Sequence, residues 1–353
     1  MISSDQISVI VQGAVGNDIE LCINSIRHQL PMAEIILSTW EGSQIPQGLA
    51  VDITILNKDP GARPFNLNAS LPNNTNRQLI STIAGLRQAT RPYTLKLRTD
   101  FQIVHTGFLQ AFTCHHLRTT AFIHYREKIV IPHYSTRFPE SATPYPFHPS
   151  DLCLFGMTED LIKHFDVPLL DESDWDWALN RADKTKTPHS DSPFRPRFAP
   201  EQHFFVHSLR AHGHAIPIQH HHDVSGDIPQ LSRQYLVNNF VVLDMHEFGV
   251  TTQKPTLAYA IDRDIGNCYS SAIYRAEYRL WCDPNAPLHW RDALEARLVR
   301  NKRLHEKFVK HHLAMRQHAL LMLENPPEGR FSHGHKMLAD GLSTLYYFLR
   351  AIV

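Results

Sequence analysis

Apolar positions follow two different periods along the first hundred residues. Continuous apolar runs rich in β-branched residues alternate with segments whose apolar residues recur every three or four positions, as in buried strands and amphipathic helices. The predicted strands are 7–15, 33–40, 51–57 and 93–103, and the predicted helices are 18–30 and 74–90. Strands and helices alternating at this spacing predict an α/β fold with an open, mostly parallel sheet flanked by helices.

The middle of the chain is richer in loops. Residues 138–151 and 184–202 combine proline with small polar residues, as loops over an active site often do. Between them, 152–165 predicts a strand followed by a helix. Residues 201–219 predict a helix that closes near Gly213 and then a short strand.

Helical patterning dominates from about residue 287, so we expect one domain over 1–285 and a helical C-terminal extension over 286–353. Basic residues outnumber acids there and lie among apolar ones, which is typical of a helix resting on an anionic membrane surface or a partner. A core-covering helix with a solvated basic face shows the same pattern. The residues are Arg297, Arg300, Lys302, Arg303, Lys307 and Lys310, with Leu294, Leu298, Phe308 and Met315.

Composition excludes several classes of protein. Lys plus Arg and Asp plus Glu number 35 each, so no global positive field points to a nucleic-acid partner. The five cysteines form no CxxC pair, which argues against a zinc module and a disulfide framework. No basic leader opens the chain, and no apolar run approaches the roughly 20 residues that span a bilayer. We expect a cytoplasmic protein, peripheral on the inner membrane if the extension binds there.

Charged residues end the predicted strand 93–103. Lys96, Arg98 and Asp100 lie on one side of this strand by alternation, whereas the residues between them are apolar or small. Ligands of open α/β sheets bind at the carboxyl ends of the strands, so the cluster indicates a binding site. A surface ion pair on an edge strand is the alternative. By the same rule, ligands should collect at 12–16, 39–42 and 57–61.

Two charged residues stand at predicted helix starts. Asn74 or Thr75 can cap the helix 74–90, but Arg77 lies in its first turn, where the helix dipole disfavours a cation and a bound diphosphate would supply negative charge. Glu201 begins the helix after the second proline-rich loop. It either complements the helix dipole or acts as a general base for an acceptor hydroxyl.

A run of three histidines, His220 to His222, precedes Asp223. Imidazole and carboxylate groups both bind divalent ions, which makes His222 a candidate metal ligand. On a strand, His220 and His222 share one face and His221 and Asp223 the other, so at most two of these side chains converge. A wet surface cluster of histidines is the alternative.

The order of several motifs resembles the WavE lipopolysaccharide-synthesis family of bacterial envelope-polysaccharide enzymes. The motifs follow one another over residues 7–250: VIVQGAV, LPMAEIILSTWEGS, KDPG, NNTNRQLISTIAGLRQATRPYTLKLRTD, PFHPSDLCLFG, APEQ and NNFVVLD. The resemblance implies a GT-A-like glycosyltransferase fold, whose sheet holds a nucleotide-sugar donor. It also implies a divalent cation, Mn²⁺ or Mg²⁺, on the donor diphosphate.

The resemblance also implies roles for single residues. Asp100 in LRTD matches the last acid of the GT-A DxD motif and is the predicted metal ligand, but Arg98 stands where the first acid would be. A cation there can itself neutralise a diphosphate. Glu201 in APEQ matches the acid that is the base in inverting members, and Gln12 and Gly13 match the nucleoside contacts.

Sugar transfer needs a cradle for two phosphates and a base for the acceptor hydroxyl. Arg77, Lys96, Arg98 and Asp100 can form the cradle, and Glu201 or Asp151 the base; Asp151 can instead hold acceptor hydroxyls. We therefore expect a glycosyltransferase that moves a sugar to a glycan or glycolipid acceptor, in the lipopolysaccharide core or capsule. The alternatives are a non-catalytic phosphosugar- or polysaccharide-binding protein and a hydrolase using the 220–223 histidine cluster.

Overall fold

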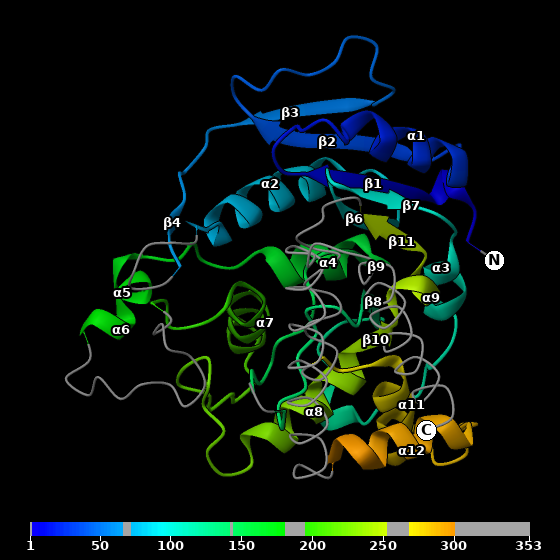
Figure 1. Cartoon of the computed structure of the whole chain (residues 1–353), viewed down its shortest axis with the longest axis vertical. Coiled ribbons are helices and arrows are strands. Elements are labelled where there is room, and N and C mark those ends of the chain that lie inside the picture. The colour runs from blue at the N-terminus through cyan, green and yellow to red at the C-terminus, as the bar shows by residue number, and fades with distance from the viewer. Residues whose placement is uncertain (1, 66–71, 142–143, 181–194, 253–267, 301–353) are drawn as a thin grey trace, which may run out of the picture.

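A seven-stranded sheet forms the centre of the computed structural model, which describes residues 2–65, 72–141, 144–180, 195–252 and 268–300. The strand order is β10-β8-β9-β6-β1-β2-β3 (Figure 1). The strands are β1 (Ile7–Gln12), β2 (Glu34–Trp40), β3 (Ile53–Asn57), β6 (Tyr93–Arg98), β8 (Ile129–Pro132), β9 (Leu154–Met157) and β10 (Phe240–Leu243). Only β9 runs antiparallel to its neighbours in this sheet, β6 and β8. The predicted mostly parallel α/β sheet is confirmed.

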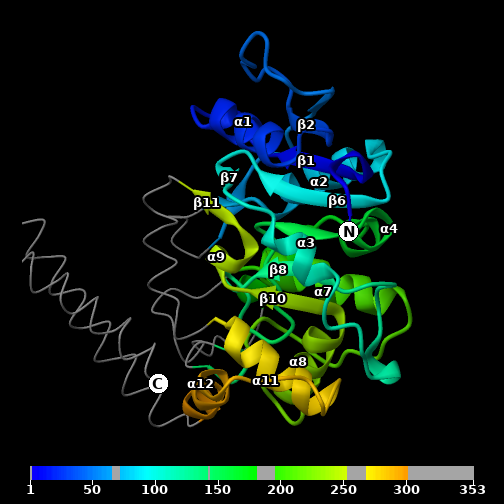
Figure 2. The ribbon, with the colours of Figure 1, turned by 90° about the vertical axis from the view of Figure 1, so that its right-hand side faces the viewer.

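Helices cover both faces of the sheet (Figures 1 and 2). The chain moves outward from β1 to β2 and β3, and then returns across them to β6. Right-handed crossovers therefore place α1 and α2 on opposite faces. Helices α4 and α7 lie on the same face of the sheet as α2, because α2 packs against α4 and α4 packs against α7. The main helices are α1 (Ile19–Gln29), α2 (Thr75–Gln88), α4 (Thr158–Phe165), α7 (Pro200–Ala211), α8 (Ile228–Asn239) and α11 (Ser271–Trp281).

The remaining elements are short, except for α12. The helices are α3 (Gly107–Phe112), α5 (Glu172–Trp175), α6 (Trp177–Asn180), α9 (Met245–Phe248) and α12 (Trp290–Arg300), with 3₁₀ turns at Ser4–Gln6 and Thr120–Phe122. Two small antiparallel pairs join β4 (Arg63–Pro64) with β5 (Pro72–Asn73) and β7 (Phe101–Ile103) with β11 (Val250–Thr252).

The fully buried strand β1 contributes to the centre of the core. Every residue of β1 is buried, and α2 crosses it so closely that a Cβ added at Gly85 would lie 2.3 Å from Ile10 Cγ2. A larger residue at Gly85 would have to displace a core side chain. This close packing fixes α2 across β1.

The structure differs from the sequence prediction in two segments. The predicted strand 93–103 is divided, because the chain turns at 99–100 and β7 pairs with β11 outside the main sheet. No strand forms among the described residues 215–219 after α7, where Arg210 donates to the carbonyl oxygens of Ile216 and Ile218. The Arg210 side chain therefore binds backbone carbonyl groups that would otherwise accept hydrogen bonds from a neighbouring strand.

At its C-terminal end the described chain folds back on itself. Helix α12 packs on α11, where Arg275 pairs with Asp292 at 2.8 Å and Ser270 donates to Glu295 at 2.6 Å. The basic residues predicted to contact a membrane lie mostly in 301–353, outside the described residues. Among the helices that the structure describes, none has the length and apolar character needed to cross a bilayer.

Candidate active site

The polar carboxyl ends of β1, β2 and β6 meet where the strand order reverses: the chain adds β2 and β3 on one side of β1 and β6 on the other. Gln12 is in register with Arg98 on β6 and with Ser38 on β2. The Gly13 amide donates to the Ser38 carbonyl at 3.1 Å, and a φ of +119° at Gly13 turns the chain out of the sheet. Thr99 Oγ1 then donates to the Ala14 carbonyl at 2.8 Å. Ligands of open α/β sheets bind at such a reversal point, so Gln12, Gly13 and Arg98 share one candidate site.

Arg98 and Asp100 form an ion pair, which is the alternative interpretation of this cluster, although β6 is a central strand and Asp100 lies in the turn after it. Arg98 Nε donates to Asp100 Oδ1 at 3.0 Å and Nη2 to Oδ2 at 2.8 Å. Asp100 is only 7% exposed, whereas about a quarter of the Arg98 side chain, 26%, remains open to solvent. A guanidinium held by a carboxylate is rigid, and its open part can still bind an anion.

Lys96 lies deeper than the sequence suggested. The side chain is 1% exposed, and its ammonium donates to the backbone carbonyl of Asp151. Burial lowers the pKa of Lys96, while the Asp151 carboxylate acts against this effect. Lys96 therefore anchors the chain at Asp151 to β6 and places a basic group beneath the site.

Two carboxyl groups, the buried Asp151 and the partly buried Glu201, lie near Lys96. Burial, followed by repulsion from Glu201, raises the pKa of Asp151 to about 6, although Lys96 and Arg98 act to lower it. Burial also raises the pKa of Glu201. Glu201 belongs to the first turn of α7, directly after Pro200. Acids with raised pKa values beside basic groups are typical of acid–base catalysis.

Ser135 and His148 hold Glu201 in place. The Ser135 hydroxyl donates to Glu201 Oε1 at 2.6 Å, and His148 Nε2 lies 3.3 Å from Oε2. His148 Nδ1 contacts the Ser135 carbonyl at 2.8 Å, and a carbonyl only accepts, so Nδ1 carries the proton and Nε2 of the neutral ring is free to accept one. Burial lowers the pKa of His148 to about 3. Protonated Glu201 can therefore donate to His148.

Arg77 has its counter-charge within the chain. Its guanidinium binds Asp59 with both Nε and Nη2, at 2.7 and 2.6 Å, and Nη1 donates to Asn74 Oδ1 at 3.0 Å. Asn74 is the N-cap residue, but its side chain does not cap the helix; Asn73 instead accepts from the Thr75 amide at 2.8 Å. The negative charge expected near this first turn therefore comes from Asp59.

The four residues 220–223 form a turn rather than a strand. His222 Nδ1 lies 2.5 Å from the Pro144 carbonyl, and its ring packs on Tyr145. Asp223 accepts from the Gln219 amide at 2.9 Å and from the Ser225 hydroxyl at 2.7 Å. The face-sharing expected of these residues on a strand is therefore wrong, because the segment turns and forms no strand.

Asp100 and His222 do not fit a divalent ion in this arrangement. Both Asp100 oxygens accept from Arg98, which lies where a metal ion would bind. In the part of the chain that the structure describes, no group of three potential ligands includes Asp100 or His222. Metal dependence of the donor site stays a prediction from the sequence.

A sequence model of WavE lipopolysaccharide synthesis matches residues 7–303. The chain belongs to the WavE lipopolysaccharide synthesis family. The match begins at β1, continues past residue 285 through α12, and includes every residue of the site described above. Curated proteins give no significant match. Membership places this WavE protein in the synthesis of lipopolysaccharide.

In this WavE protein, sequence reasoning missed Ser135 and His148. His148 lies in the PFHPSD motif, so a signal was present, but nothing local indicates that it meets Glu201 53 positions later. Ser135 and Phe147 both have positive φ, of 66° and 57°. Non-glycine residues in this conformation are uncommon and gather at functional sites, and both flank the Glu201–His148 contact.

The buried charge of Asp151 predicts a pH-dependent gain in stability for Asp151→Asn. The native pKa of Asp151 is about 6, which is above its ordinary value, so the folded state favours the protonated form. The stability that Asp151 contributes is therefore fully present below its ordinary pKa and is lost as the pH rises through about 6. Asn cannot ionise, so the variant should be more stable above pH 6 by up to about 3 kcal/mol, with the difference vanishing near pH 4. Urea unfolding from pH 4 to 8 measures this.

Asp52→Asn provides the matched control for that experiment. Hydrogen bonds from the Ile35 amide and Arg27 lower the pKa of Asp52, although its own burial opposes them. The control should therefore lose stability at neutral pH, which is the opposite sign. Equal pH profiles for wild type and Asp151→Asn would contradict the assignment of a buried, destabilising charge to Asp151.

Proposed function

We propose that this WavE protein is a glycosyltransferase that moves a sugar from a nucleotide-sugar to an acceptor glycan of the bacterial envelope, in the lipopolysaccharide core or capsule. The observation that carries the proposal is the meeting of two kinds of group at one sheet edge. Arg98, held by Asp100, offers a rigid cation, and Asp151 and Glu201 offer two largely buried acids with raised pKa values. Membership of the WavE family supports a role in lipopolysaccharide synthesis.

The donor would lie across the carboxyl ends of β1 and β6. In this proposal the nucleoside contacts Gln12 and Gly13, and the diphosphate contacts the open part of the Arg98 guanidinium. Negative charge grows on the diphosphate as the bond to the sugar breaks, so a preorganised cation there stabilises the transition state more than the ground state. Asp59 already pairs with Arg77, so Arg77 would add positive charge to the donor site only if this pair opened.

Glu201 would act as the base. Deprotonation of an acceptor hydroxyl as it attacks the sugar carbon is general base catalysis, which a raised pKa strengthens. A proton received by Glu201 can then be shared with His148 Nε2, while Ser135 keeps the other oxygen in place. Asp151 would hold hydroxyl groups of the acceptor, or act as the base in place of Glu201. The proposal also includes a cytoplasmic location, peripheral on the inner membrane, where the enzyme would meet its nucleotide-sugar donor.

Nucleotide release from a panel of nucleotide-sugars tests this function. A thermal-shift screen with and without Mn²⁺ first identifies the donor, and release of free nucleotide with an envelope lipid extract is then measured. Binding without release would favour the non-catalytic phosphosugar-binding protein. Loss of activity in His220→Gln/His222→Gln would favour the histidine-metal hydrolase, whereas unchanged activity is expected if those side chains only hold the turn.

A further inference from the structure

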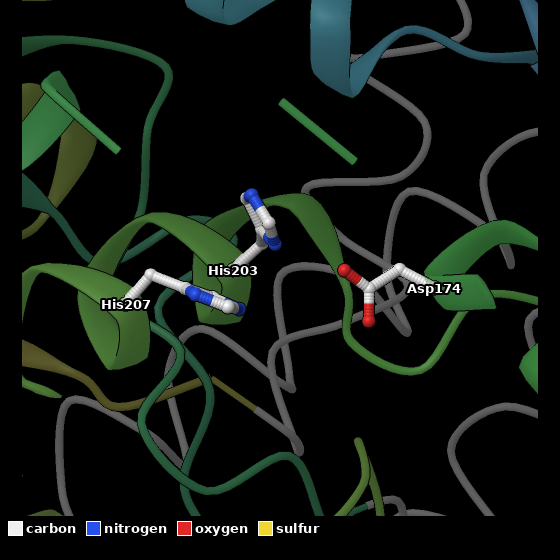
Figure 3. A group of neighbouring side chains, drawn as sticks. All are labelled: Asp174, His203 and His207. Carbon is white, nitrogen blue, oxygen red and sulfur yellow. The ribbon is translucent and has the colours of Figure 1, made fainter. Parts of the chain in front are cut away.

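Three potential metal ligands converge on the side of α7 away from Glu201. Asp174 on α5 faces His203 and His207 on α7, and one ligand atom from each lies within 4.8 Å of the others (Figure 3). The two histidines are four residues apart and therefore neighbours on one helix face. Their ring centroids are 4.3 Å apart. Neither the family match nor the sequence patterns assign a role to these residues.

Hydrogen bonding orients His203 toward this group. Its Nε2 lies 2.7 Å from the Pro168 carbonyl, so Nε2 carries the proton and Nδ1 keeps its lone pair. His203 is 1% exposed. Within the described ranges, neither His203 Nδ1 nor His207 Nε2 has a hydrogen-bond partner, although both atoms are buried. Buried nitrogens without partners are rare and costly, so each such atom needs an explanation.

We propose that Asp174, His203 and His207 bind one Zn²⁺ ion. Imidazole nitrogens and a carboxylate oxygen are ordinary zinc ligands, and an ion gives both lone pairs a partner. Bonds of about 2 Å require ligand atoms no more than about 4 Å apart, so small side-chain rotations complete the site. The Pro168 carbonyl acts as the outer partner that fixes the His203 tautomer. Water completes the coordination.

The backbone around Asp174 is already organised for this role. The Asp171 carboxylate caps α5 by accepting from the amides of Ser173 and Asp174, at 2.8 and 3.0 Å. The Arg197 amide donates to the Asp174 carbonyl at 2.9 Å. These contacts fix the backbone of Asp174 beside α7 before an ion arrives, which lowers the cost of binding.

The ion would fasten α5 to α7 behind the active site. His203 and His207 follow Glu201 by two and six positions, which are roughly 200° and 240° around the helix. They therefore lie away from the face that presents Glu201. The buried His203 ring leaves little room for a substrate, so the ion has a structural role, separate from any metal on the donor diphosphate.

Titration of the chelator-treated full-length chain with Zn²⁺ alone tests the site. Calorimetry with a competing chelator should give one ion per chain, and Asp174→Asn and His207→Gln should each weaken binding at least a hundredfold. The double variant His220→Gln/His222→Gln is the matched control, because it also removes two neighbouring histidines but should bind Zn²⁺ as the wild type does. Circular dichroism checks the fold of each variant.

Thermal unfolding and cobalt spectra give two further readouts. Zn²⁺ should raise the melting temperature of the wild type and the control by several degrees and leave Asp174→Asn unchanged, because only a ligand bound to the native state stabilises it. Co²⁺ should give visible absorption that the ligand variants lose. If His207→Gln does not fold, Asp174→Asn decides. No binding by the wild type, or unchanged binding by Asp174→Asn, overturns the proposal.

Discussion

Glu201→Gln is expected to lower the turnover of sugar transfer by roughly a hundredfold or more while donor affinity stays nearly unchanged. The amide keeps the shape of the side chain but cannot take a proton from the acceptor. Donor contacts are assigned to Gln12, Gly13 and Arg98, not to Glu201, so binding should persist. Initial rates at saturating donor, together with calorimetric titration of the donor, separate the two effects.

Two companion variants sharpen this result. Ser135→Ala removes the hydrogen bond that lowers the pKa of Glu201, so the low-pH limb of the rate profile should move to higher pH while the enzyme stays active. Asp151→Asn should retain more turnover than Glu201→Gln. If Glu201→Gln instead loses donor affinity and keeps its turnover, Glu201 is a binding residue and Asp151 is the better base.

Arg98→Ala is expected to weaken donor binding by at least a hundredfold. The variant removes the partly open cation at the proposed diphosphate position and leaves the Asp100 carboxylate, only 7% exposed, without its bidentate partner. Arg87→Ala is the control, since Arg87 also forms an ion pair, with Asp166 at 3.0 Å, but lies at the far end of α2. Its donor affinity should equal that of the wild type.

Metal dependence is decided in the same titrations. Donor affinity of the wild type and of Asp100→Asn is measured with Mn²⁺ and then with a chelator. Wild-type binding that resists the chelator and disappears in Arg98→Ala means that arginine takes the metal's role, as the bidentate pair suggests. Collapse of Mn²⁺-dependent binding in Asp100→Asn would instead make Asp100 a metal ligand. Equal affinities for all variants and conditions would contradict the donor site.

Local pattern was sufficient to predict the parallel half of the sheet. The apolar run of β1 and the helical spacing of α1 and α2 are continuous in sequence, and right-handed crossovers then leave few topologies. Arg98 and Asp100, two positions apart, do contact each other, but through the turn that follows β6 and not through strand alternation. These features depend on neighbours within a few residues.

Contacts between distant segments could not be predicted in this way. Arg77 binds Asp59 from the loop after β3, and Glu201 meets Ser135 and His148 from loops between strands. Such partners depend on how the loops fold over the sheet, which hydrophobic periodicity does not encode. The metal group was missed for the same reason, since Asp174 comes from a different helix than His203 and His207.

Detection of the transferred product is the most direct test of the account. The purified full-length protein, the donor found by thermal shift and an envelope lipid extract are incubated, and mass spectrometry follows the acceptor while free nucleotide is quantified. The account predicts that the acceptor gains one sugar mass for each nucleotide released. At a donor concentration below saturation, the initial rate of this gain should fall roughly a hundredfold or more in Glu201→Gln and in Arg98→Ala, while Arg87→Ala keeps the wild-type rate. Nucleotide-sugar binding without any gain of mass, or wild-type rates in Glu201→Gln and Arg98→Ala, would contradict it.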